Sequence, residues 1–227
     1  MTRRLVTVDG PAGSGKSTLA RRLARALGVP IIDTGALYRA VTVAGVRRGI
    51  DPDADSALAR LTAAIRIHLE TDPGHPDRVT VDGEEVTAAL HDPALAPLLA
   101  RVSSDPGVRR ELLEPQRSLL RNGEGVAAGR DCGTVVFPEA TVKLYLEAQE
   151  EIRLVRRAAQ LDRLGKLAPA VLEAEVARRD RSDASRAAAP MRPAPGALVL
   201  RTDELDIEAT LLRAIEACRA AGMLAAP

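Results

Sequence analysis

Residues 10–18 read Gly-Pro-Ala-Gly-Ser-Gly-Lys-Ser-Thr and fill the phosphate-loop pattern Gly-x-x-x-x-Gly-Lys-[Ser/Thr] without a mismatch. Glycines let the backbone wrap a phosphate chain closely, so that successive N–H groups and a helix N-terminus face the anion. In such a loop we expect Lys16 to reach the β- and γ-phosphates and the Ser17 hydroxyl to join a Mg²⁺ shell. These residues predict that the chain binds a nucleoside triphosphate together with Mg²⁺.

The segments on either side of this loop are those that the motif requires. Before it, residues 5–8 form a short apolar run that predicts a buried strand. After it, Leu19, Leu23 and Leu27 recur at helical spacing and would share one face. A glycine-rich turn without a ligand is the alternative, and this strand–turn–helix context disfavours it.

Arginine and aspartate are concentrated in three further stretches, residues 33–39, 129–131 and 178–186. Alone, each stretch has an ordinary explanation: a helix cap, a local ion pair or a solvated charged face. Beside a phosphate loop they indicate phosphoryl transfer, which needs positive charge around the migrating group, a held Mg²⁺ and exclusion of water. Arginine suits this task because it pairs bidentately with phosphate oxygens and stays charged at any working pH.

Short apolar strands alternate with helical patterns, which predicts a three-layer α/β fold with a parallel sheet and helices on both of its faces. Ligands of such sheets bind beyond the carboxyl ends of the strands. The phosphate loop, Asp33-Thr34 and Arg130-Asp131 should therefore share one edge, because each directly follows a strand. Five strands of this sheet are expected, at residues 5–8, 31–33, 126–128, 142–146 and 197–200.

Between residues 65 and 82 the apolar period changes from helical to alternating, across a loop rich in Pro, Gly and Asp. This pattern predicts a small antiparallel hairpin with one buried face, inserted into the α/β core. Helices are expected at residues 34–49, 51–64, 92–122 with a break at Pro106, 150–183 with a split near 165–169, and 207–221. We expect one domain, with a core at about 1–64, 104–148 and 187–227, an insertion for the monophosphate at about 65–103, and a helical lid at about 149–186.

The composition limits the classes of function. With 32 basic and 31 acidic residues mixed along the chain, the formal net charge is +1, unlike the concentrated basic surface of a nucleic-acid binder. Tyr38, Phe137 and Tyr145 are too few aromatics for stacking platforms on single strands. Cys132 and Cys218 lack metal-ligand spacing, and no apolar run reaches the length of a membrane span. We expect a cytoplasmic monomer without a signal peptide and without a nucleic-acid or membrane partner.

Several runs together resemble the bacterial cytidylate kinases, the (d)CMP kinases of the nucleoside monophosphate kinase group of P-loop kinases. The resemblance covers essentially the whole chain. The phosphate loop is generic, whereas Gly-Arg-Asp-x-Gly-Thr-Val-Val-Phe-Pro at 129–138 and the hairpin insertion are specific to that family. The other matching runs are Val8-Asp9 before the phosphate loop, residues 33–39, Pro106-Gly107-Val108-Arg109 with Gln116-Arg117, and Arg179-Asp180 with Asp183, Arg186 and Pro190.

The resemblance implies a P-loop kinase fold and an enzyme of pyrimidine metabolism that uses ATP and Mg²⁺ to phosphorylate CMP and dCMP. Lys16, Arg130 and Arg186 would be catalytic residues, and Ser17 would be the metal ligand. The ATP-binding residues would be Gly10, Pro11, Ala12, Gly13, Ser14, Gly15, Lys16, Ser17, Thr18 and Arg157. Arg157 would lie on the lid side, together with Arg153 and Arg156. The substrate-binding residues would be Thr34, Tyr38, Arg39, Arg109, Arg130, Asp131, Asp183 and Arg186.

Within that set, Arg109 and Asp131 would read the cytosine. Arginine donates to the ring carbonyl and ring nitrogen, and a carboxylate accepts from the exocyclic amine, where uracil instead offers a second acceptor. The family often has serine where this chain has Ala100. Loss of that serine's hydrogen bond would weaken base selectivity unless Ser103, one turn later, compensates.

Two alternative functions stay open. One is another small-molecule P-loop kinase acting on UMP, AMP or shikimate, which the run at 129–138 and the Arg109/Asp131 pair disfavour. The other is a nucleotide-binding module without catalysis. A GTPase switch is the least favoured form of it, because none of the three lysines is followed by Asp two positions on, as a guanine-reading motif requires.

Overall fold

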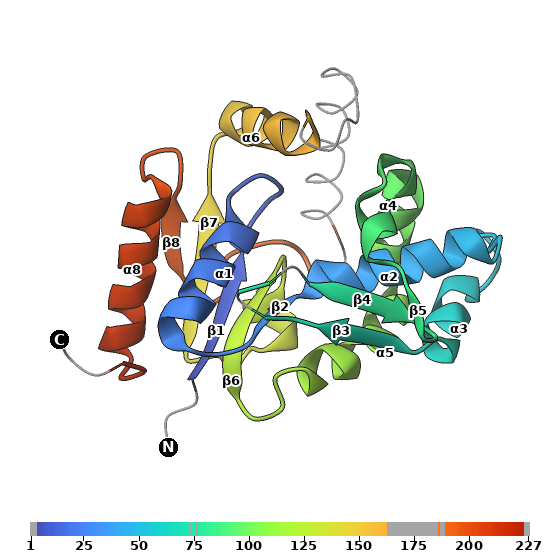
Figure 1. Cartoon of the computed structure of the whole chain (residues 1–227), viewed down its shortest axis with the longest axis horizontal. Coiled ribbons are helices and arrows are strands. Elements are labelled where there is room, and N and C mark those ends of the chain that lie inside the picture. The colour runs from blue at the N-terminus through green and yellow to red at the C-terminus, as the bar shows by residue number, and fades with distance from the viewer. Residues whose placement is uncertain (1–3, 73, 76, 163–185, 187–188, 225–227) are drawn as a thin grey trace.

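The computed structural model describes residues 4–72, 74–75, 77–162, 186 and 189–224. Its centre is a five-stranded parallel sheet with strand order β2-β6-β1-β7-β8, which confirms the predicted sheet (Figure 1). The strands are β1 (Arg4–Asp9), β2 (Ile31–Asp33), β6 (Glu124–Gly129), β7 (Val142–Glu147) and β8 (Leu198–Arg201).

Side chains of the sheet alternate between two covered faces. Val6 of β1 packs on one face with Leu19 and with the buried residues of the last helix. Leu5 points to the other face and packs with Phe137. The alternation places helices on both faces, as the predicted three-layer fold requires. The covering elements are α1 (Lys16–Leu27) and α8 (Ile207–Ala220) on the first face, and α5 (Pro106–Ser118) with the π-helical turn η3 (Cys132–Val136) on the second.

The carboxyl ends of three neighbouring strands meet at one edge of this sheet. In the register of β1 and β6, Asp9 lies opposite Gly129, and in that of β2 and β6, Asp33 lies opposite Ala128. The segments that follow β1, β2 and β6 therefore lie side by side, although they are far apart in the sequence. This arrangement is the one expected for a ligand site at the strand ends.

The alternating segment forms a separate small antiparallel sheet, and the predicted hairpin carries a third strand. Asp82 and Gly83, with φ of 51° and 86°, make the tight turn between its last two strands. Both positive angles are those that a two-residue hairpin loop favours. Buried side chains of this small sheet and of the helices packed on it form a second hydrophobic core. Its elements are β3 (Ile67–Glu70), β4 (Arg78–Val81), β5 (Glu84–Glu85), η1 (Thr87–His91), α2 (Thr34–Arg47), α3 (Ala57–Ala64) and α4 (Ala96–Ser104).

Two of the expected helices have different bounds. The helix predicted from residue 51 begins only at Ala57, because the Asp51 carboxylate accepts the Asp53 amide in a turn and Ser56 adopts a left-handed φ of 52°. The segment 92–122 is divided into η2 (Pro93–Leu95), α4 and α5. Asp105 ends α4 and caps α5 by accepting the Val108 amide at 2.8 Å, with proline in the first turn.

Helix α6 (Glu150–Asp162) lies above the phosphate loop in Figure 1. The expected helical stretch continues to residue 183, but 163–185 lie outside the described residues. None of the described helices has the length and hydrophobicity that a membrane span requires.

Candidate functional site

The phosphate loop, residues 10–18, connects the end of β1 to the start of α1. A Cβ on Gly10 would collide with the backbone carbonyl of Leu146, and the φ of Gly10 is +143°. Only glycine tolerates both the close approach and this backbone conformation. The Lys16 ammonium donates to the Pro11 carbonyl at 2.6 Å, which folds it back across the loop.

Hydroxyl and carboxylate oxygens lie together at the start of α1. The Ser17 hydroxyl donates to Asp33 Oδ2 at 3.5 Å, and Asp33 Oδ1 accepts the Gly35 amide at 2.9 Å and so caps α2. Oxygen atoms of this kind are the ligands that Mg²⁺ prefers. Ser17 was predicted as a metal ligand, whereas no role was predicted for Asp33; its place at the end of a strand was the available signal.

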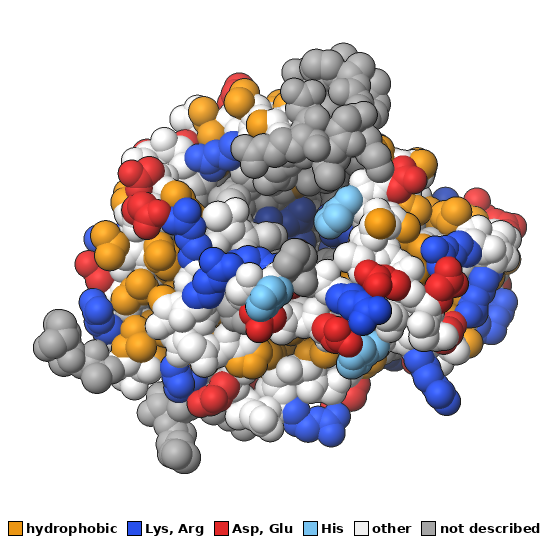
Figure 2. Space-filling view, in the orientation of Figure 1, with side chains coloured by type: hydrophobic (Ala, Val, Ile, Leu, Met, Phe, Trp, Pro, Cys, Tyr) orange, Lys and Arg blue, Asp and Glu red, His pale blue; other side chains and the backbone are white. Residues whose placement is uncertain are grey.

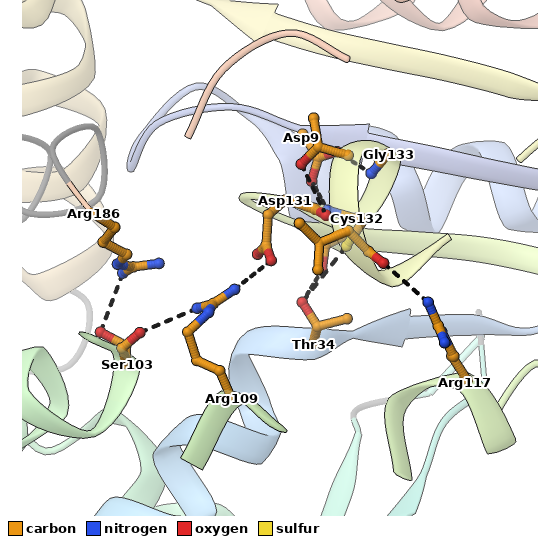
Figure 3. Close-up of polar contacts among 12 residues, drawn as sticks. Asp9, Thr34, Ser103, Arg109, Arg117, Asp131, Cys132, Gly133 and Arg186 are labelled. Carbon is orange, nitrogen blue, oxygen red and sulfur yellow. Dashed lines mark hydrogen bonds and ion pairs between the residues drawn. The ribbon is translucent and has the colours of Figure 1, made fainter. Parts of the chain in front are cut away.

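Arg109 and Asp131 form a buried ion pair (Figure 3), with side chains 9% and 7% exposed. Arg109 Nη1 also donates to the Ser103 carbonyl at 3.1 Å, and its guanidinium carbon stands 5.5 Å from the centre of the Tyr38 ring. Arg186 Nη2 reaches the Ser103 hydroxyl at 3.2 Å. Donors and acceptors are thus held side by side in a place from which water is largely excluded.

The loop after β6 is tied to the phosphate loop. Arg130 Nη1 donates to the Gly10 carbonyl at 2.9 Å. The Asp9 carboxylate accepts the amides of Cys132 and Gly133 at 2.8 and 2.7 Å (Figure 3). Burial raises the pKa of Asp9 to about 6, and the two amide hydrogen bonds limit the rise because they favour the ionised form. Sequence reasoning assigned no role to Asp9.

Helix α2 brings further predicted residues to the same edge. Thr34 begins this helix and is 4% exposed, and its hydroxyl donates to the Ala128 carbonyl at 3.1 Å. Arg39 lies further along α2, where its guanidinium approaches Gly35.

One cavity is lined both by residues of the phosphate loop and by predicted substrate-binding residues. Figure 2 shows Lys and Arg side chains at the floor of a hollow near the middle of the face in view. Asp33 and Ser103 line the cavity as well. Gly10, Pro11 and Ser14 belong to the loop but are not among the described lining residues, while Asp183 and the Arg157 side chain lie outside the described part. The predicted residues that line it are Ala12, Gly13, Gly15, Lys16, Ser17, Thr18, Thr34, Tyr38, Arg39, Arg109, Arg130, Asp131 and Arg186.

A second cavity lies on the other side of the phosphate loop, between α6 and the segment that joins β8 to α8. The Thr202 hydroxyl donates to the Ser14 carbonyl at 3.2 Å, and Arg156 donates to the Thr202 carbonyl at 2.6 Å. Arg153 Nη1 donates to the Ala12 carbonyl at 3.1 Å. Arg153 therefore holds the start of α6 against the phosphate loop, and Arg156 joins α6 to the segment that follows β8.

Gln116 and Arg117, one of the runs that resemble the cytidylate kinases, lie on α5 outside the described lining of the first cavity. Arg117 Nε donates to the Val136 carbonyl at 2.8 Å and Nη2 to that of Val135 at 3.2 Å. Gln116 is 1% exposed. Arg117 therefore holds η3, in the segment that follows Arg130 and Asp131.

The chain is similar to known proteins over almost all of its length. Residues 6–220 match the family model described as cytidylate kinase. The chain is 41% identical over 204 residues to a cytidylate kinase of Pelotomaculum thermopropionicum, covering 89% of this chain and 90% of that protein. An uncharacterized protein from Eubacterium ventriosum, 10% identical with a TM-score of 0.51 over 96% of this chain and 99% of its own, shares the fold.

Bifunctional proteins are also similar. A bifunctional pantoate ligase/cytidylate kinase of Gloeobacter violaceus is 48% identical over 217 residues, which cover 93% of this chain and 42% of that protein. The chain therefore spans about two-fifths of the length of these bifunctional relatives. The match to the family model over almost all of its residues shows that the chain belongs to the cytidylate kinase family.

Proposed function

We propose that this chain transfers the γ-phosphoryl group of ATP to CMP and dCMP, giving CDP and dCDP. One observation carries the proposal: the phosphate loop with Lys16 and the Arg109–Asp131 pair line the same cavity. A triphosphate on the loop and a small base-bearing acceptor on the pair would meet between them. Membership of the cytidylate kinase family supports the same reaction.

The donor would lie along the phosphate loop. Its β- and γ-phosphates would face the backbone amides of the loop and the Lys16 ammonium, which would leave its Pro11 carbonyl. The second cavity, with Leu205 and Ile207 in its wall, offers an apolar slot for the adenine. Ser17, with Asp33 beside it, fits a hard cation and would hold Mg²⁺. A bound Mg²⁺ would neutralise charge that develops between the β- and γ-phosphates.

The acceptor phosphate would lie among arginines. Arg39, Arg130 and Arg186 all line the cavity, and their guanidinium groups stay charged at any working pH. Arginine binds phosphate oxygens bidentately, which fixes the direction of the attacking oxygen as well as neutralising its charge. Arg130 is bound to the Gly10 carbonyl, and this contact keeps it next to the place where the γ-phosphate would lie.

Cytosine would be read by the buried ion pair. The Asp131 carboxylate would accept from the exocyclic amine, and Arg109 would donate to the ring nitrogen and carbonyl. Uracil presents a carbonyl where cytosine has its amine, so two acceptors would oppose each other. In a site this buried, an unmatched polar group costs about 1–3 kcal/mol, and more when it is charged. Ser103, bonded to both Arg109 and Arg186, would support the two arginines in place of a serine at Ala100.

The transfer itself would need no strong base, because the acceptor oxygen belongs to a phosphate that is already anionic. Catalysis would come from alignment of the two phosphates and from fixed positive charge on Lys16, Arg130 and Arg186 around the migrating group. Closure of the lid would exclude water. The roles of Asp183 and Arg157, the cytoplasmic location and the monomeric state remain predictions.

An acceptor panel tests the proposal. The chain is incubated with ATP and Mg²⁺ plus CMP, dCMP, UMP, AMP or shikimate, and ADP release is followed. We expect release with CMP and dCMP at least about tenfold faster than with UMP, as one opposed acceptor pair requires. Release with another acceptor alone would support the alternative kinases, and ATP binding without acceptor-dependent release would support a non-catalytic module.

Variants in the same assay separate catalysis from folding. Arg130→Ala should lower turnover by about two orders of magnitude or more, because a fixed donor to the transition-state charge is lost. Arg213→Ala, an exposed arginine on α8, is the matched control and should leave turnover unchanged. Near-normal turnover of the Arg130 variant would contradict the proposed mechanism.

A further inference from the structure

A buried carboxylate joins the two loops that line the cavity. Asp9 is the last residue of β1, is 3% exposed, and directly precedes the phosphate loop. Each of its oxygens holds one backbone amide, Oδ1 that of Cys132 and Oδ2 that of Gly133, at 2.8 and 2.7 Å. These amides come directly after Asp131. We call residues 129–133 the base-reading loop; Asp9 grips its end.

The two loops are also tied in the opposite direction. Arg130 of the base-reading loop donates to the carbonyl of Gly10 in the phosphate loop at 2.9 Å. Between these contacts, Asp9 and Gly129 are opposite each other in the register of β1 and β6. Arg130 thus holds the backbone of the phosphate loop, and Asp9 at the end of β1 holds that of the base-reading loop, so that the two loops have a defined orientation relative to each other.

The base-reading loop is packed closely around this carboxylate. A Cβ added to Gly133 would lie 2.8 Å from Thr7 Oγ1 and 3.3 Å from Asp9 Oδ2. A Cβ added to Gly129 would lie 2.5 Å from Thr34 Oγ1. Contacts this short are not tolerated without a shift of the backbone, so both glycines are needed for the close approach.

We propose that Asp9 is a positioning residue for cytosine recognition, which fixes the direction of the Asp131 carboxylate through the amides of Cys132 and Gly133. This role rests on the proposed CMP kinase activity. Among the described residues, the cavity lining includes Asp131 but not Asp9. Asp9 therefore acts through the loop and does not touch the nucleotide. Without this grip, Asp131 could turn away from the cytosine amine and would no longer oppose the uracil carbonyl.

The charge of Asp9 follows from its surroundings. Burial is the main cause that raises its pKa to about 6, and the Asp131 carboxylate adds to the rise. The Cys132 thiol also faces it, with a pKa that burial raises well above the ordinary value, so this thiol stays neutral. On β7 its neighbour in register is Tyr145. Only the ionised carboxylate offers full acceptor strength to both amides, so the grip weakens as Asp9 takes up a proton.

The first test replaces Asp9 by asparagine. The substitution keeps the shape but turns one amide-accepting oxygen into an N–H donor that faces a backbone N–H. We expect kcat/KM for CMP to fall about tenfold or more, as loss of a charge-assisted hydrogen bond predicts, while kcat/KM for UMP falls less. The CMP/UMP ratio therefore narrows, and KM for CMP rises more than KM for ATP. Asp92→Asn, which alters an exposed carboxylate bonded to the Ala94 amide, is the matched control and should leave the ratio unchanged.

The second test is the pH dependence of the CMP/UMP ratio in the unmodified protein. Both acceptors carry the same titrating phosphate, so its protonation cancels in the ratio. If only the form with ionised Asp9 discriminates, a pKa of about 6 predicts a ratio about fourfold lower at pH about 5.5 than at about 7.5. In the Asp9→Asn variant the ratio should not change over this range.

Gly133→Ala disturbs the same contact from the side of the base-reading loop, and it replaces the first test if the Asp9 variant does not fold. It should narrow the CMP/UMP ratio, and in the double variant the two effects should be less than multiplicative because they break one contact. A purely structural role of Asp9 would lower the unfolding temperature and leave the ratio and its pH dependence unchanged; that result would overturn the proposal. Absence of CMP phosphorylation in the unmodified protein would instead contradict the proposed function.

Discussion

Replacing Asp131 by asparagine should reverse much of the preference for cytosine. The change preserves the volume of the side chain but replaces one carboxylate oxygen by an N–H donor. The cytosine amine then faces a donor or a neutral acceptor, whereas the uracil carbonyl can accept from the new amide. The structure makes this position sensitive, because the Asp131 and Arg109 side chains are 7% and 9% exposed and water cannot replace a lost partner.

The magnitude follows from this burial. Loss of a hydrogen bond to a charged group costs about 1.5–3 kcal/mol, which corresponds to about a ten- to 150-fold lower kcat/KM for CMP. A neutral hydrogen bond gained by uracil contributes about 0.5–1.5 kcal/mol in the other direction. The CMP/UMP ratio should therefore fall by about a hundredfold, and UMP should gain in absolute terms.

Asp131→Ala is the comparison that separates reading from packing. It leaves the Arg109 guanidinium without its carboxylate partner, a change that costs about 3–5 kcal/mol when the charge stays buried. Alanine offers uracil no donor, so the alanine variant should lose activity on CMP without a gain on UMP. The assay is kcat/KM for both acceptors at saturating ATP, with thermal unfolding of each variant alongside. Equal losses on the two acceptors in the asparagine variant would refute the assignment of Asp131 to the base.

Three further changes have defined outcomes. Lys16→Ala should lower kcat by about 10²–10³-fold in the ADP-release assay with the unfolding temperature nearly unchanged, because a fixed charge on the migrating group is lost; near-normal turnover would exclude this role. Asp9 has a folded pKa of about 6, above its ordinary 3.8, so its contribution to the free energy of unfolding is present below pH about 3.8 and is lost as pH rises through about 6. Denaturant unfolding should show the unmodified protein losing up to about 3 kcal/mol relative to Asp9→Asn over that window, and a pH-independent difference would contradict the shift. Arg21 pairs with Asp77 at 2.8 Å and also donates to two carbonyls of the hairpin loop. A double-mutant cycle of Arg21→Ala and Asp77→Ala should give a coupling free energy of about 0.5–1 kcal/mol for this partly exposed pair. Zero coupling would show that the contact does not hold the hairpin to α1.

The central sheet could be predicted because its strands are short, apolar and bounded by clear breaks. Residues such as Val6 and Val8 are buried, and the glycines of the phosphate loop mark where β1 ends. The third strand of the small sheet was missed because Glu84 and Glu85 are both exposed and show no apolar alternation. Asp82-Gly83 was its signal, since this dipeptide favours a two-residue hairpin turn.

The helix expected from residue 51 was wrong at its start for a similar reason. Helical periodicity does not detect side chains that bond to nearby backbone, as Asp51 does with the Asp53 amide. Such turns compete with the first turn of a helix. The boundary was therefore decided by local hydrogen bonds, not by the pattern of apolar residues.

The phosphate loop and the residues at the strand ends, such as Thr34 and Arg130, could be predicted from motifs and topology, whereas Arg109 on α5 and Arg186 were expected only from the family resemblance. Asp9 could not be assigned a role, since its partners Cys132 and Gly133 are 123 and 124 positions away in the chain. The Ser17–Asp33 contact likewise depends on the neighbouring strand ends. The contacts of Asp9 arise from the pairing of β1 with β6 and leave no local pattern in the sequence.

A competition experiment tests the central claim most directly. CMP, dCMP, UMP and AMP are mixed at equal concentration with a limiting amount of ATP, Mg²⁺ and the protein, and the diphosphates are separated and quantified. The geometry of Arg109 and Asp131 beside the phosphate loop predicts that CDP and dCDP form in large excess over UDP. The amount of ADP should equal the summed amounts of CDP, dCDP and UDP, because ATP gives one ADP per transfer and AMP gives none. A product mixture dominated by UDP or by ADP made from AMP, or no product at all, would contradict it.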